Sequence, residues 1–141
     1  MTKEDLEKYY LETTYSVVIN EEQYDIKIDN PLPLILEELL SKEKTAAVLT
    51  TWNPRSEILP LLKNYSRNEK LNSILKNYKL FHAMGQGVDS SWSAEESFFI
   101  VGIKQSEVDK LAIEFEQYAY VWCESGKTAS LVFTDLWQDK A

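Results

Sequence analysis

The chain has 141 residues, of which 44% are hydrophobic and 27% charged, and its net charge is −8. One soluble globular domain fits these values, and the acidic balance argues against nucleic acid and anionic membranes as partners. The single cysteine excludes an intramolecular disulfide, the charged N-terminus is unlike a signal peptide, and no apolar run approaches the roughly 18 residues of a membrane helix, so we expect a cytoplasmic protein.

Residues 1–52 predict a helix, a β-hairpin, a second helix and a buried strand. Thr2 and Asp5 have the spacing of a capping box at a helix start. The segment YDIKI alternates in polarity and follows YSVVI after a short connection, a pattern typical of a hairpin. In chain order the expected elements are a helix from residue 2, strands at 15–19 and 24–28, a helix opening at 31 and a strand at 46–52.

The rest of the chain begins with a turn at Asn53-Pro54. Pro60 favours a helix start there, running to about residue 78, although Ser66 and Glu69 also match a capping box and allow a start at Ser66. A helix starting at Ser106 follows later. The other expected ranges are a strand at 80–84, a loop at 85–96, the strongest strand at 97–103, a helix to about 118 and a hairpin of 120–124 with 129–133.

This order of elements favours the α+β class. We expect a single domain over residues 1–141, with an N-terminal helix and hairpin in 1–30. Its sheet should be mixed and mostly antiparallel, with about six to seven strands and helices packed mainly on one face. The two strand–helix–strand passages leave parallel pairs open.

The stretch from residue 50 to 71 is the main candidate for a site. It lies in the basic third of the chain, since residues 45–80 carry a net charge of +4 between two acidic flanks. Such a patch favours a small anion or an acidic partner, and amides with guanidinium groups suit a carboxylate or phosphate. The candidate ligand-binding residues here are Asn53, Arg55, Asn64, Arg67 and Asn68.

These residues also have a structural interpretation. Asn53 precedes a proline, which favours an extended backbone, and its side chain can bond the nearby backbone. Arg67 can pair with an acidic side chain such as Glu95 or Glu96, and the basic segment can pair with the acidic flanks in the fold. The sequence leaves both interpretations open.

A second cluster lies where the chain enters the strongest strand. Gly85 and Gly87 permit a close backbone approach or a positive φ. Trp92 can close over a site or anchor its loop to the protein body, and Glu96 is the candidate general base. Trp92 and Ser97 complete the candidate ligand-binding residues.

Other chemistry is not indicated. Zinc sites need several His or Cys ligands, and the chain has only His82 and Cys123. Cys123 follows Trp122 in an apolar strand and is expected to be a buried, inert thiol. No phosphate-binding glycine motif is present, so we expect no metal and no cofactor.

These motifs resemble those of a known family, the DUF3293 proteins, which are bacterial proteins of unknown function. The resemblance covers about residues 45–125 and rests on Trp52-Asn53-Pro54, Asn64 to Asn68 with Leu71, Gly85 and Gly87, Trp92, Glu96-Ser97-Phe98 and Gln117 to Trp122. Where the family usually has an acidic residue before the helix asparagine, this chain has Lys63, so a catalytic role for that acid would be missing here. The resemblance implies a small single-domain protein and no particular activity.

Two functions of different class follow from these residues. The first is the binding of a small anionic or nucleotide-like ligand at the strand–helix junction around Asn53–Arg67. The second is a non-enzymatic protein–protein interaction module with an acidic, aromatic-rich surface. Trp92 separates them, because a tryptophan in a concave pocket favours the first and one on a flat exposed patch favours the second.

Overall fold

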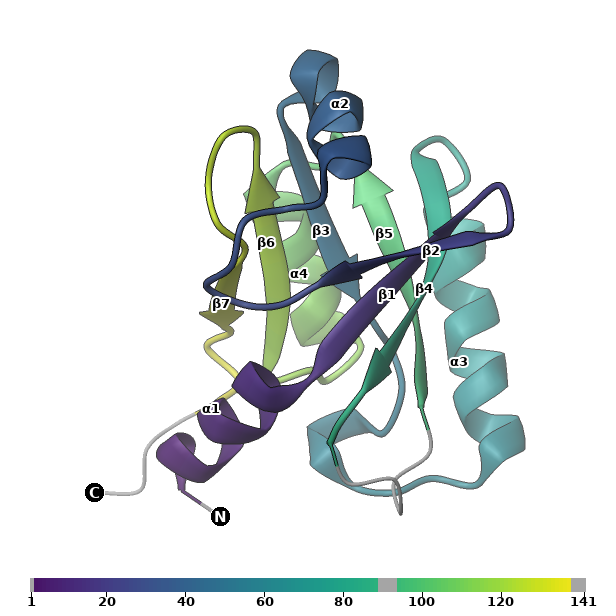
Figure 1. Cartoon of the computed structure of the whole chain (residues 1–141). Coiled ribbons are helices and arrows are strands. Elements are labelled where there is room, and N and C mark those ends of the chain that lie inside the picture. Colours follow the sequence, from purple (N-terminus) through teal and green to yellow (C-terminus); the bar gives the residue numbers. More distant parts are fainter. Residues whose placement is uncertain (1, 89–93, 138–141) are drawn as a thin grey trace.

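The computed structural model of the chain describes residues 2–88 and 94–137. Over these residues seven strands form one antiparallel sheet that curls into a half-barrel, with four α-helices around it (Figure 1). The sheet order is β2-β1-β4-β5-β3-β6-β7. In chain order the elements are α1 (Lys3–Glu12), β1 (Thr14–Ile19), β2 (Glu22–Ile26), α2 (Leu34–Glu43), β3 (Thr45–Leu49), the short 3-10 turn η1 (Pro54–Ser56), α3 (Leu61–Ile74), β4 (Lys79–Gln86), β5 (Glu95–Val101), α4 (Gln105–Glu114), β6 (Ala119–Glu124) and β7 (Ser130–Phe133).

The expected α+β class and the seven-stranded sheet are confirmed. All strand pairings in the described residues are antiparallel, so the parallel pairs that the sequence left open do not form there. The sheet order gives the reason. Each of α2, α3 and α4 connects two strands that have at least one other strand between them, so no helix joins neighbours.

Two of the expected helix starts are settled by the structure. α3 begins directly after Pro60, so the alternative start at Ser66 is wrong. α4 has Lys104 at its N-cap position, so Ser106 lies inside the helix and does not cap it. Within residues 2–88 and 94–137, no helix has both the length and the apolar composition needed to cross a bilayer.

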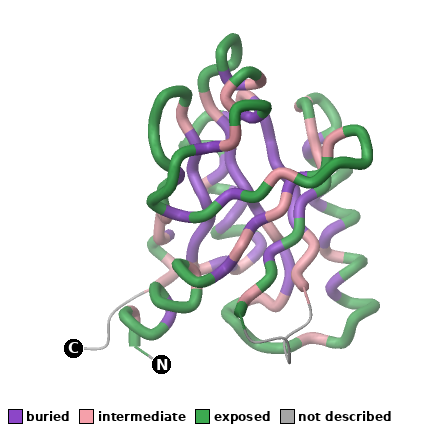
Figure 2. Tube along the Cα trace, viewed as in Figure 1, coloured by how far each residue is buried: buried purple, intermediate pink, exposed green. Residues whose placement is uncertain are grey.

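Apolar side chains fill both faces of the sheet. Because side chains alternate along a strand, β5 sends Phe99 to one face and Phe98 to the other. We call the Phe99 side the inner face; α2 and the curled β1–β2 hairpin enclose it. On the outer, Phe98 side, α3 and α4 pack with Leu71 and Val108. Helices therefore lie on both faces of the sheet, and not mainly on one face as the sequence predicted. Figure 2 shows the buried residues concentrated in the central strands.

The two strands on either side of the loop that contains Gly87 are longer than expected. β4 runs to Gln86 and β5 begins at Glu95, so Gly85 lies inside a strand and the expected loop 85–96 is shorter. Gly85 pairs with Tyr15 of β1 on one side and with Glu95 of β5 on the other. A Cβ atom at Gly85 would lie 3.4 Å from the Tyr15 ring. That distance is an ordinary van der Waals contact, so the Tyr15 ring does not exclude a side chain at Gly85.

Small residues leave space on the inner face at this end of the sheet. Gly85 places no side chain between Tyr15 and Glu95, and in the next row Ala83 pairs with Ser97. Helix α1 lies over this space, and its first turn is fixed by the predicted capping box, in which the Thr2 side chain accepts from the Asp5 N–H at 3.1 Å. The hollow that remains is described below.

The outer core predicts a large difference between two leucines of the same helix. Leu71 is fully buried whereas Leu62 is 83% exposed. Leu71→Ala should lower the free energy of unfolding by about 2–5 kcal/mol through lost burial and a residual cavity, and Leu62→Ala by less than about 0.5 kcal/mol. Urea denaturation of both variants measures this. Equal effects would show that α3 does not pack on the sheet as described.

Candidate functional site

The chain leaves β3 in a tight turn that Asn53 holds in place. The Asn53 backbone N–H donates to Asn64 Oδ1 at 2.9 Å, and Asn53 Oδ1 accepts from Asn64 Nδ2 at 2.8 Å and from the Leu59 N–H at 3.1 Å. Asn53 is left-handed, with φ 45°, so the extended backbone expected before Pro54 is wrong. Asparagine enters this region more easily than most residues, and the three hydrogen bonds keep it there.

Two more residues of this turn are left-handed. Arg55 has φ 54° and Ser56 has φ 59°. Arg55 is held from outside: its backbone N–H donates to the Glu116 carbonyl and its Nε donates to the Glu116 carboxylate, both at 2.8 Å. Backbone strain of this kind persists only where surrounding contacts fix it, and it is concentrated at functional sites.

The polar residues further along α3 form hydrogen bonds with backbone carbonyls and with a side-chain hydroxyl. Arg67 Nε donates to the Thr51 carbonyl at 2.9 Å, and its Nη2 donates to the Phe115 carbonyl. Asn68 Oδ1 accepts from the Thr51 hydroxyl at 3.3 Å. No carboxylate of the described residues pairs with Arg67. The guanidinium therefore joins the end of β3 to the end of α4.

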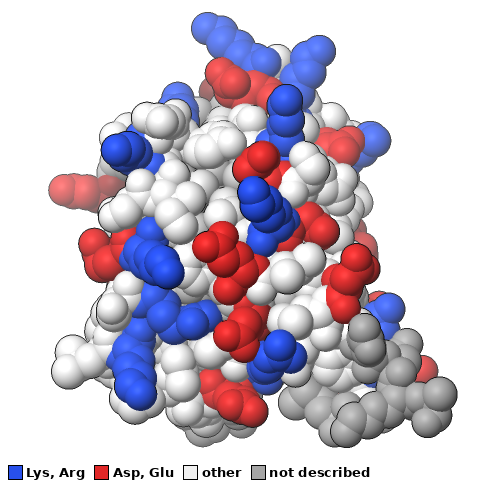
Figure 3. All heavy atoms as spheres, turned by 180° about the vertical axis from the view of Figure 1, so that it is seen from behind, with Lys and Arg blue, Asp and Glu red and all other residues white. Residues whose placement is uncertain are grey.

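The basic charge of α3 lies on the outside of the molecule. Lys63, Arg67 and Lys70 share one face of the helix, and the two lysines are exposed. Seen from behind, Lys and Arg side chains gather on the side where α3 lies, beside a group of acidic side chains (Figure 3). This surface is separate from the cavity described next, because none of the three residues lines it.

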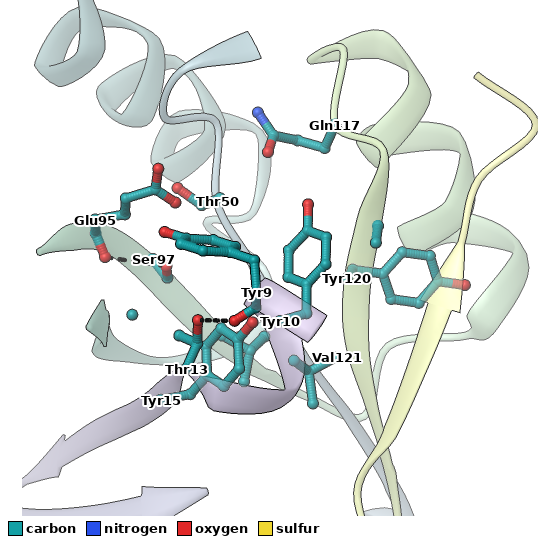
Figure 4. Close-up of a pocket in the computed structure, with 13 residues that line it drawn as sticks. Tyr9, Tyr10, Thr13, Tyr15, Thr50, Glu95, Ser97, Gln117, Tyr120 and Val121 are labelled. Carbon is teal, nitrogen blue, oxygen red and sulfur yellow. Dashed lines mark hydrogen bonds between the residues drawn. The ribbon is translucent and has the colours of Figure 1, made fainter. Parts of the chain in front are cut away.

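A cavity opens between α1 and the turn after β3. Its volume is about 140 Å³, and an adjoining hollow of about 40 Å³ continues it toward the small residues of the sheet. We call the two together the α1 cavity. The residues that line both parts are Tyr9, Tyr10, Glu95 and Gln117 (Figure 4). The larger part is completed by Leu6, Trp52, Asn53 and Ser56.

Glu95 supplies the charged group of the α1 cavity. Burial raises the pKa of its carboxyl from 4.5 to about 7, and a hydrogen bond from Asn53 lowers it by a smaller amount. That bond, from Asn53 Nδ2 to Glu95 Oε1, is long, at 3.3 Å. Among the described residues no Lys, Arg or His lines the cavity. The Glu95 carboxylate therefore has no cationic neighbour in the part of the wall that the structure describes.

Gln117 presents its side-chain oxygen to the same space. Its Nε2 donates to the Trp52 carbonyl at 3.1 Å and to the Phe115 carbonyl at 3.3 Å, which uses both amide hydrogens. The orientation of the amide is thereby fixed, and Figure 4 shows its oxygen on the side of the tyrosine rings. No described residue donates to this oxygen, so it is a second acceptor directed into the cavity.

Two tyrosines of α1 form the aromatic wall. The ring centroids of Tyr9 and Tyr10 lie 5.8 Å apart in an edge-to-face arrangement. Burial raises the pKa of Tyr9 to about 12, and the nearby Glu95 adds to the shift; the pKa of Tyr10 is raised by the same two causes. Both phenols therefore stay protonated at neutral pH. Figure 4 shows the Tyr9 hydroxyl directed toward Glu95.

The structure separates the residues that the sequence proposed for ligand binding. Asn53 lines the larger part of the cavity and Ser97 the smaller part. The remaining described candidates lie in the hydrogen-bond network or on the surface beside Glu116, and they are Asn64, Arg67, Asn68 and Arg55. Trp92 lies outside the described residues.

Glu96, the candidate general base, lies on the outer face of β5. Glu95 and Ser97 share the inner face with Phe99, and Glu96 alternates to the other side. The carboxylate that lines the cavity is therefore that of Glu95. The alternation of the strand carries this signal: a carboxylate two residues before Ser97 must share its face.

The structure also shows the surroundings of the single cysteine and the single histidine, which the sequence analysis considered as metal ligands. Cys123 is buried, as expected, and burial raises the pKa of its thiol to about 12. The His82 ring packs against Phe98 with 5.7 Å between ring centroids. In the described part of the chain no three His, Cys, Asp or Glu side chains lie close enough together to hold a metal ion.

The described residues form a seven-stranded α+β fold with an aromatic cavity that contains a carboxylate. The chain belongs to the DUF3293 family, described as a protein of unknown function, whose family model matches residues 49–120. The match confirms the resemblance found in the sequence, and it includes Asn53, Glu95 and Gln117 but not α1. No curated protein and no solved structure matches the chain.

The hydrogen bonds of Arg67 predict that this residue stabilises the fold far more than Arg55. Arg67→Ala leaves the carbonyls of Thr51 and Phe115 without their charged donor, and the free energy of unfolding should fall by about 2–4 kcal/mol. Arg55→Ala removes a half-exposed ion pair that solvent screens, and it should cost much less. Chemical denaturation compares them, and similar losses would contradict the structural role of Arg67.

The raised pKa of Glu95 predicts a defined pH dependence of stability. The unfolded side chain ionises near 4.5, whereas the folded one stays protonated to about 7. Its contribution to the free energy of unfolding is therefore complete below pH 4.5 and is lost as the pH rises through 7, by up to about 3 kcal/mol. Glu95→Gln should remove this loss.

Urea denaturation between pH 4 and 8 measures the effect. The matched control is Glu96→Gln, which retains Glu95 and should therefore keep the wild-type slope. An identical slope in wild type and Glu95→Gln would show that the carboxylate is not buried in the cavity.

Proposed function

We propose that this protein binds a small organic molecule in the α1 cavity, at the junction between β3 and α3. The observation that carries the proposal is Glu95, a largely buried carboxylate that accepts one long hydrogen bond from the described residues, in a wall of aromatic side chains. Burying a charged group costs stability unless it finds a partner. A ligand that completes the hydrogen bonds of Glu95 would offset this cost.

The size of the cavity supports a ligand with a single ring or a short chain. Its larger part, about 140 Å³, is close to the roughly 150 Å³ that accommodates a benzene-sized molecule. Predominantly apolar walls with a few fixed polar groups are the usual composition of small-molecule sites. The aromatic side chains of Tyr9 and Trp52 provide the walls, and Glu95 and Gln117 provide the polar groups.

The site keeps the location that the sequence suggested, near Asn53, but its polar groups differ. The guanidinium of Arg67 is engaged with backbone carbonyls and that of Arg55 with Glu116. Apart from the Asn53 amide that donates to Glu95, the side-chain polar groups in the described lining are acceptors or neutral hydroxyls. The lining therefore favours a ligand with donors over the small anion considered from charge alone.

The alternative function, a protein-interaction module, rests on a different surface. Ile58, Leu61 and Leu62 are 71%, 54% and 83% exposed around the start of α3. Apolar residues gathered at the surface are typical of contact sites. A size-exclusion experiment with wild type and Leu62→Glu tests it: a concentration-dependent oligomer lost in the variant supports this function, and a monomer in both counts against it for self-association.

Ligand binding predicts that a fragment screen finds at least one compound that needs Tyr9. Neutral and charged single-ring compounds are screened by ligand-detected NMR against wild type and against Tyr9→Ala, which removes the aromatic wall. The matched control is Tyr24→Ala, a tyrosine of β2 that lines neither part of the cavity. We expect binding to wild type and Tyr24→Ala that weakens at least tenfold in Tyr9→Ala. No binding, or equal binding to all three, would refute the proposal.

A further inference from the structure

The polar atoms that face the α1 cavity are unequal in kind. Glu95 offers carboxylate oxygens, of which one accepts a 3.3 Å hydrogen bond from Asn53. Gln117 offers an amide oxygen whose nitrogen is already engaged twice. Asn53 Oδ1 is also occupied, by the Leu59 N–H and by Asn64 Nδ2. The hydroxyls of the lining can donate or accept, whereas the remaining capacity of Glu95 and Gln117 is for accepting, and donors of a ligand would complement it.

The charge of the lining also favours a ligand that carries N–H donors, because it favours a cation. The described lining has one ionisable acid and no basic side chain, so a cationic ligand gains an opposite charge and an anionic one meets a like charge in a poorly solvated site. Aromatic faces attract cations through the ring quadrupole. Tyr9, Tyr10 and Trp52 supply such rings around the same space.

We propose that the ligand of the α1 cavity is a small organic cation that carries N–H donors, an amidinium or a primary ammonium group on a single ring or short chain. This inference rests on the proposed function and names the ligand class for that site. Amidinium has two parallel N–H groups that match the two oxygens of a carboxylate, the geometry that makes such pairs strong. A quaternary ammonium ion fits the aromatic wall, but it leaves the acceptors of Glu95 and Gln117 without donors.

The same arrangement makes binding depend on pH. The titratable groups that face Glu95 are the phenols of Tyr9 and Tyr10 from α1 and of Tyr15 from β1, and all three have raised pKa values and remain neutral. Glu95 is thus the group that changes charge between pH 5.5 and 8, since its pKa is about 7. A cation binds the ionised form, so its affinity should rise with pH across this interval and level off above it.

Three compounds of nearly equal shape test the inference: benzamidine, which is cationic at these pH values, benzamide, which is neutral, and benzoate. Isothermal titration calorimetry at pH 8 measures each against wild type and against Glu95→Gln, which keeps the size of the side chain and removes its charge. We expect benzamidine to bind wild type at least about tenfold more tightly than benzamide, and benzoate to bind least. Glu95→Gln should abolish the preference, and lowering the pH to 5.5 should weaken benzamidine binding about tenfold or more while benzamide is unaffected.

The outcomes separate this inference from the proposed function. If benzamide or benzoate binds as tightly as benzamidine, and Tyr9→Ala abolishes that binding, the cavity is a ligand site but its ligand is not a cation. If benzamidine binds equally to wild type and Glu95→Gln, the cation is not recognised by Glu95 and the inference fails. If none of the three compounds binds at millimolar concentration, the inference fails, and the fragment screen against wild type and Tyr9→Ala decides the proposed function separately.

Discussion

The reciprocal hydrogen bonds between Asn53 and Asn64 are the constraint on which the site depends. The Asn64 Nδ2 group donates to Asn53 Oδ1, and Asn64 Oδ1 accepts from the Asn53 backbone N–H. This N–H lies in a turn with three left-handed residues. Backbone groups withdrawn from water need such partners. Once Asn53 Oδ1 and its backbone N–H are engaged with α3, the Asn53 Nδ2 group is left for Glu95. One pair of amides therefore sets the path from β3 to α3 and also orients a donor toward the cavity carboxylate.

The smaller part of the cavity lies where the inner face carries small residues. Gly85 of β4 and Ser97 of β5 line it, and α1 covers it with two large tyrosines that do not fill the space. The network of Arg67, Asn68 and Gln117 supports this region from the side of α3 and α4. Rigid support around an unfilled space is what a preformed binding site requires.

The sequence predicted the elements well because their patterns are local. The capping box at Thr2, the proline before α3 and the alternation of the hairpin strands each concern neighbours in the chain. The extended backbone expected at Asn53 and the acidic partner considered for Arg67 are wrong, because the contacts that decide them come from residues 6 to 48 positions away. The sequence therefore indicates the junction but not which of its polar residues the fold itself engages.

The match to the DUF3293 family includes one part of the wall of the α1 cavity and not the other. The acceptors, Glu95 and Gln117, lie inside the matched segment, whereas the aromatic wall of Tyr9 and Tyr10 comes from a helix outside it. A protein that keeps the matched segment and carries a different N-terminal helix would retain these acceptors and would change the shape of the space they face. Exchange of one short surface helix would thus reshape the cavity without disturbing the sheet or the amide pair that holds the junction, and under the proposed function it would change which ligand fits.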